Sequence, residues 1–164
     1  MAWLFPWLLL IHVLSAIAGF GPTYAFSVIG AMGGAEPQHA NFATRVSERL
    51  TTRFVFPAAA VQLVTGILMI VIAPFDLTSR QFWWLDIAIV IFVINVGFAY
   101  LVQHPKVKQL IEMTSAPPPG GASGPPSGPP PALVALVGQI QRGGIFMTVM
   151  LTIIIFLMVV KPQF

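Results

Sequence analysis

The sequence predicts an all-α membrane protein built as a bundle of four transmembrane helices. Hydrophobic residues make up 57% of the 164 residues and charged residues only 8%, whereas an ordinary soluble domain is about a quarter charged. The apolar residues gather in four runs, each long enough to cross a hydrocarbon layer about 30 Å thick. In such a layer every backbone N–H and C=O needs a partner within its own segment, so we expect these runs to be helices.

Four apolar spans follow one another along the chain. They cover approximately residues 3–30, 54–73, 83–102 and 143–160. Proline interrupts helices, so Pro74 is expected to end the second span and His104-Pro105 the third. Lys161-Pro162 is expected to end the fourth span in the same way.

The stretch between the third and fourth spans has a different composition. Residues 116–131 contain only Pro, Gly, Ser and Ala, which bury too little apolar surface to offset the entropy of ordering. This stretch is predicted to be a flexible linker, with residues 132–142 as an interfacial helical lead-in to the fourth span. So little sequence lies outside the spans that residues 1–164 are expected to form one membrane domain.

The basic residues predict an orientation. The first and third connections carry six Lys and Arg residues, and the opposite side carries two. The six are Arg45, Arg49, Arg53, Lys106, Lys108 and Arg142, and the two are Arg80 and Lys161. By the positive-inside rule, the first and third connections are expected in the cytoplasm and both termini outside it. We therefore interpret the net charge of +3 as an orientation signal, with the lipid bilayer and not nucleic acid as the partner.

Polar side chains inside the spans carry the functional signal, because such groups are unfavourable in lipid unless they face a partner. The candidate site consists of six of them: His12, Ser15, Gln62, Thr65, Asn95 and Thr148. Helical spacing places His12 and Ser15 on one stripe of small residues, and the rise along antiparallel helices brings the polar groups near the bundle middle.

Two interpretations of His12 remain open. In the first, His12 is the metal ligand of a cofactor or ligand site between helices, with haem b as the candidate although the sequence does not identify the cofactor. In the second, His12 makes an interhelical hydrogen bond to Gln62, Asn95 or a threonine. Bis-histidine ligation with His104 is excluded, because helical rise separates the two residues by more than one iron tolerates. A copper site formed by the methionines of the fourth span is disfavoured.

Several classes of chemistry are disfavoured or excluded. The chain has no cysteine, which excludes disulfides, Fe–S clusters and covalent attachment of c-type haem. No hydrolase, kinase or nucleotide-binding motif is present, so we name no catalytic residues and an enzyme is disfavoured. A transporter would need a continuous polar path, which four helices supply only in an oligomer.

Three segments of the spans resemble a known family. They are Leu9–Ala16, Gln62–Leu68 and Phe156–Pro162. These segments are similar to the bacterial membrane proteins of the domain of unknown function 2269 family, which is grouped with copper-resistance D-like membrane proteins. The resemblance implies a multi-pass protein of the bacterial inner membrane. A haem-binding oxidase of the wider group has a histidine early in its first helix, and this histidine maps onto His12. No residue of this chain matches a second haem ligand. Oxidase activity is therefore not carried over.

Two function classes follow. The first is a membrane protein that binds haem or another ligand around His12 in a redox or metal-homeostasis role. The second is a non-catalytic accessory or structural subunit of a larger membrane complex or a homo-oligomer. A ligand site requires His12, Asn95 and Thr148 to converge around a cavity, whereas a structural role requires the polar groups to bond to one another.

Overall fold

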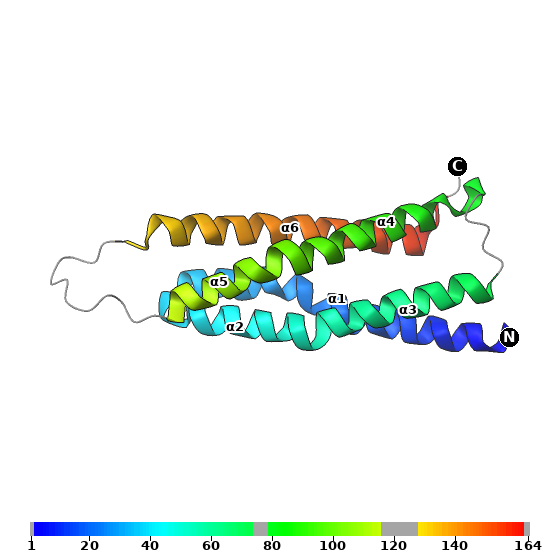
Figure 1. Ribbon diagram of the computed structural model, residues 1–164, viewed down its shortest axis with the longest axis horizontal. Helices are drawn as coiled ribbons and strands as arrows, with labels where there is room; N and C mark the ends of the chain where they lie inside the picture. The colour runs from blue at the N-terminus through cyan, green and yellow to red at the C-terminus, as the bar shows by residue number, and fades with distance from the viewer. Residues whose placement is uncertain (1, 74–78, 116–127, 163–164) are drawn as a thin grey trace.

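The computed structural model describes residues 2–73, 79–115 and 128–162, and these residues contain helices and no strand (Figure 1). The α-helices are α1 Phe5–Ala35, α2 Ala40–Leu50, α3 Phe56–Ile72, α4 Trp83–Phe98, α5 His104–Ser115 and α6 Pro131–Val160. Together they form an elongated bundle in which α1 begins and α6 ends at the same end (Figure 1).

Four continuous helical segments are long and apolar enough to cross a membrane. They are Phe5–Ala35, Pro37–Ile72, Arg80–Ser115 and Pro131–Val160. The prediction of an all-α membrane protein with four transmembrane helices is therefore confirmed. The second and third segments have 36 residues each, a length of about 54 Å at about 1.5 Å per residue. Since the hydrocarbon layer is about 30 Å thick, part of each extends beyond it.

Four of the expected helix bounds differ from the observed ones, the first being that α1 continues past residue 30 to Ala35. The second helix begins well before residue 54, the third continues past residue 102 to Ser115, and the fourth begins at Pro131 and not near residue 143. Hydropathy marks only the part of a helix that lies in lipid. The backbone hydrogen bonds of the helix continue beyond the lipid, so the helix itself is longer than its apolar part. The predicted lead-in 132–142 is thus part of α6 itself. Most of the predicted linker, residues 116–127, lies outside the described residues.

Proline does not end the third helix because the backbone widens before it. A π-helical segment, Ala99–Gln103, joins α4 to α5 and comes just before Pro105. A second π-helical segment, Thr51–Val55, joins α2 to α3 and comes just before Pro57. A proline lacks an N–H and its ring crowds the carbonyl four residues earlier, which in both cases lies in the π-helical segment. The helices therefore continue through both prolines.

The helices pack mainly in two pairs, α1 with α3 and α4 with α6, while α2 lies between α1 and α5. Figure 1 shows α4 and α6 together on one side and α1 and α3 on the other. The buried core joins Trp84, Leu85 and Ala88 of α4 to Ile154 and Leu157 of α6. Most other large apolar side chains of the spans are exposed, as expected for helices that face lipid.

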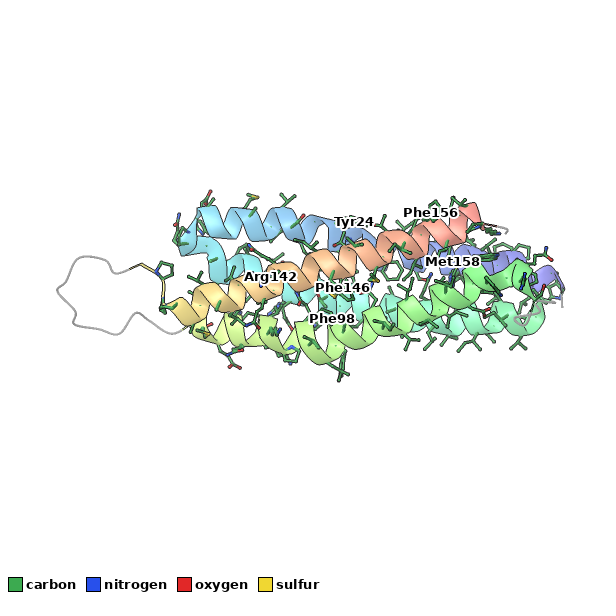
Figure 2. The ribbon with its side chains drawn as sticks, turned by 90° about the horizontal axis from the view of Figure 1, so that it is seen from above. Tyr24, Phe98, Arg142, Phe146, Phe156 and Met158 are labelled. Carbon is green, nitrogen blue, oxygen red and sulfur yellow. The ribbon has the colours of Figure 1, made fainter. Side chains whose placement is uncertain are left out.

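Aromatic contacts extend the α4–α6 pair along its length. Phe98 and Phe146, which Figure 2 labels, meet edge to face with ring centroids 5.1 Å apart. At the end of the bundle where α6 finishes, the Lys161 ammonium lies 5.5 Å from the ring centroid of Trp84. The opposite end carries α2, α5 and the beginning of α6, and therefore most of the basic residues.

Candidate functional site

His12 of α1 lies half-buried against α3 and is hydrogen-bonded through both ring nitrogens. Its Nδ1 lies 2.8 Å from Thr65 Oγ1, and its Nε2 lies 2.8 Å from Gln62 Nε2. The Ser15 hydroxyl in turn lies within donating distance of two acceptors, Gln62 Oε1 at 2.5 Å and the His12 carbonyl at 2.8 Å. Four of the six predicted site residues thus form one connected set, the α1–α3 polar network of His12, Ser15, Gln62 and Thr65.

One assignment of the protons satisfies every partner in the α1–α3 polar network. Thr65 Oγ1 donates to the Val61 carbonyl over 2.7 Å, so its oxygen is left to accept from His12 Nδ1–H. Gln62 Oε1 accepts from Ser15, so the Gln62 amide nitrogen donates to an unprotonated His12 Nε2. This arrangement corresponds to a neutral imidazole with its proton on Nδ1, and it satisfies the ring completely.

Small residues allow α1 and α3 to approach closely enough for these bonds. A side chain at Gly19 would collide with the Cβ of Ala58, so α1 and α3 meet there with no room for a methyl group. Gly66 faces the imidazole, and a Cβ at that position would lie 3.4 Å from His12 Cε1. The small-residue stripe predicted around His12 therefore serves helix packing, as in other membrane helix pairs.

Asn95 and Thr148 belong to the other helix pair. Asn95 of α4 donates from Nδ2 to the Met147 carbonyl of α6 over 3.3 Å. Thr148 donates to the Gly144 carbonyl of its own helix over 2.9 Å. Within the described residues no hydrogen bond joins either side chain to His12. The six predicted residues are therefore divided between the α1–α3 pair and the α4–α6 pair.

The arrangement around His12 does not fit a haem iron or a metal ion. An axial ligand must present an unprotonated nitrogen with a free lone pair, and both nitrogens of His12 already have partners in the protein. Among the described residues no three His, Cys, Asp or Glu side chains come together as a metal site would require. His104 contacts the rings of Phe56 and Tyr100 at centroid distances of 5.5 and 6.5 Å, away from the α1–α3 polar network.

A protein-family comparison covers almost the whole chain. The family model described as "Predicted integral membrane protein (DUF2269)" matches residues 6–162. The chain belongs to this family. Neither the curated proteins nor the solved structures gave a match. This DUF2269 protein is thus a small integral membrane protein with several spans in a lipid bilayer.

One polar residue of the DUF2269 chain was missing from the predicted site. Gln103 is 9% exposed, and its amide nitrogen donates to the Ile140 carbonyl of α6 over 2.8 Å. Gly143 provides the space for this amide, since a side chain there would collide with Gln103. Gln103 lies two helical turns beyond Asn95 and faces the same neighbour, a spacing visible in the sequence once the helix is extended past residue 102.

Two buried amide oxygens of the same helix lack partners. Asn95 Oδ1 and Gln103 Oε1 make no hydrogen bond to the described residues. Such oxygens are unfavourable in an apolar interior, so the α4–α6 pair is less completely satisfied than the α1–α3 polar network. A further contact joins the two helix pairs, because Tyr24 Oη of α1 lies 3.0 Å from Thr152 Oγ1 of α6.

Proposed function

We propose that this DUF2269 protein is a non-catalytic membrane subunit that packs against another membrane-embedded chain through α1. The observation that carries the proposal is the low coverage of this helix. Only 6% of the most apolar part of α1 is buried, against 11% for the segment containing α4 and 22% for the segment containing α3 and for α6. The proposal also agrees with the α1–α3 polar network, whose groups bond to one another and leave no free ligand atom on His12.

The C-terminal part of α1 has the composition of a helix–helix contact. Gly30 and Gly34 are exposed, and a Cβ at either position would meet nothing within 4 Å. Ser27 and Ala31 are exposed one turn from these glycines. Small residues spaced four apart let two backbones approach closely. Gly33 of the same stretch packs against Ala40 and Ala43 of α2, so this contact lies at the membrane surface, level with α2, and not within the hydrocarbon layer. We call Ser27, Gly30, Ala31 and Gly34 the α1 small face.

The proposal also covers the type of membrane and the orientation of the protein in it. We infer that the protein is in a bacterial inner membrane with both termini outside the cytoplasm, since most basic residues lie at the other end of the bundle. The relationship to copper-resistance D-like proteins stays a prediction. Haem b at His12 is disfavoured, because Gln62 or Thr65 would have to release a ring nitrogen first.

Cysteine cross-linking in native membranes tests the proposal directly, since the chain has no cysteine of its own. Ser27→Cys places a thiol on the α1 small face, and Ala25→Cys is the exposed control on roughly the opposite side of the helix. We expect a cross-linked product from Ser27→Cys alone. Adding Gly30→Leu and Gly34→Leu is expected to abolish it, whereas Gly21→Leu, on another side of the helix and outside the α1 small face, is expected to leave it.

Two results would contradict the proposal. Equal cross-linking at Ser27 and Ala25 would indicate random encounters in the membrane. A visible Soret band in the purified protein that disappears in His12→Ala would establish haem and make a cofactor role primary.

A further inference from the structure

A basic groove runs along the outer side of α2 and the π-helical segment that follows it. Its volume is about 680 Å³. The lining residues are Phe42, Arg45, Val46, Arg49, Leu50, Arg53 and Phe54. All of them come from one continuous helical segment, and we call this feature the α2 groove. Its three arginines and its two phenylalanines are exposed, so the α2 groove is accessible.

Three uncompensated positive charges line the α2 groove. Arg45, Arg49 and Arg53 recur every four residues, and all three are exposed. The ion pair found in the described part of the chain joins His39 to Glu36, and none there involves these arginines. Glu48 is half-buried on the same helix and lies too far from them for an ion pair. The guanidinium groups are thus available to an external anion.

The position along the helix places these arginines at a membrane surface. Arg53 is the last charged residue before the uncharged helix α3, so it marks where the second segment enters the hydrocarbon layer. Arg49 and Arg45 lie about 6 and about 12 Å farther out at about 1.5 Å per residue. The headgroup region is about 5–8 Å thick on each side of the bilayer, so the three side chains cover its whole depth.

Apolar side chains share the α2 groove with the arginines. Phe54 is 53% exposed and lies at the end nearest the membrane, and Leu50 lies one turn away. A free phosphate ion would make no use of such a surface. Basic and apolar side chains alternate along the helix here, so a molecule with an anionic head and an apolar tail would contact both kinds.

We propose that the α2 groove binds an anionic phospholipid. The headgroup phosphate lies against Arg45, Arg49 and Arg53, and the upper part of an acyl chain lies against Leu50 and Phe54. A guanidinium group offers parallel N–H donors that match two phosphate oxygens, which explains why all three cations of the α2 groove are arginine and not lysine. This inference does not depend on the α1 small face or on the proposed function.

Lipid titration of the purified protein tests the inference. The full chain in neutral detergent is mixed with phosphatidylglycerol or phosphatidylcholine, and bound lipid is counted by native mass spectrometry. We expect tighter binding of phosphatidylglycerol. Replacing all three arginines (R45Q, R49Q and R53Q) is expected to weaken it about 100-fold, or about fivefold for each charge removed.

A matched triple variant controls for total charge. K106Q, K108Q and R142Q also remove three cations, but these residues do not line the α2 groove. We expect this control to change phosphatidylglycerol binding less than about fivefold. Circular dichroism of each variant checks that the helices are retained.

Three outcomes would overturn the inference. Equal loss in both triple variants would mean that only net charge matters. Displacement of the lipid by inorganic phosphate at equal concentration would identify a free-phosphate site. Equal binding of the two lipids to the unaltered protein would show that the headgroup charge is not recognised, and this last comparison needs no variant.

Discussion

Breaking the contact between His12 and Gln62 is expected to destabilise the pairing of α1 with α3. In Gln62→Leu, the hydrogen bonds from Gln62 to His12 Nε2 and from Ser15 to Gln62 are both lost, while the Ser15 hydroxyl keeps the His12 carbonyl as an acceptor. Interhelical hydrogen bonds in membranes average about 0.6 kcal/mol and reach about 1.7 kcal/mol. The two lost bonds therefore predict a decrease of about 1–3 kcal/mol in the free energy of unfolding.

A double-mutant cycle isolates the pair. His12→Leu, Gln62→Leu and the double variant are unfolded with increasing dodecyl sulfate in mixed micelles, and the remaining helix is followed by circular dichroism. We expect a coupling energy of about 0.6–1.7 kcal/mol, because the second substitution removes a group that the first has already left unpaired. Thr148→Val is the control, since that hydroxyl bonds only within its own helix.

Additive effects would refute this reasoning. If the free-energy changes of His12→Leu and Gln62→Leu sum to that of the double variant within about 0.5 kcal/mol, the two side chains are not coupled. Coupling of the same size between His12→Leu and Thr148→Val would likewise show that the measured energy does not come from the α1–α3 polar network.

Two further substitutions test the packing. Gly19→Ala is expected to lower the free energy of unfolding by about 1–3 kcal/mol, because the new methyl group meets Ala58. Gly21 has open space around it, so Gly21→Ala is expected to be neutral or stabilising. Both are measured in the same dodecyl sulfate titration. Asn95→Leu is expected to change the free energy of unfolding by less than about 0.5 kcal/mol. Asn95 Oδ1 has no partner among the described residues, and Nδ2 makes only one long hydrogen bond. A loss above about 1.5 kcal/mol would contradict this expectation.

The four spans were predictable because lipid imposes a composition that can be read directly from the chain. The helix ends were not, because hydropathy falls where a helix leaves the bilayer even though its hydrogen bonds continue. Pro105 is the clearest example. In sequence it indicates a helix end, but the π-helical segment before it accommodates the ring, and α5 continues to Ser115.

The candidate site was predictable only within each helix pair. Helical spacing places His12 with Ser15, and antiparallel rise places Thr65 at the depth of His12, and these residues do lie together in the structure. Hydropathy does not specify which helices become neighbours, so Asn95 was grouped with His12 although α4 pairs with α6. Gln103 was missed because the predicted span ended one residue before it.

Nitrogen-15 magnetic resonance of labelled histidine in bilayers tests the central claim, that both ring nitrogens of His12 are bound within the protein. Comparison with His12→Ala assigns the signal. We predict a neutral ring with the proton on Nδ1, because Thr65 accepts there and Gln62 donates to Nε2. A doubly protonated ring or a signal that shifts on addition of haem would contradict the account, whereas a proton on Nε2 would reverse the donor and acceptor roles and leave both nitrogens bound.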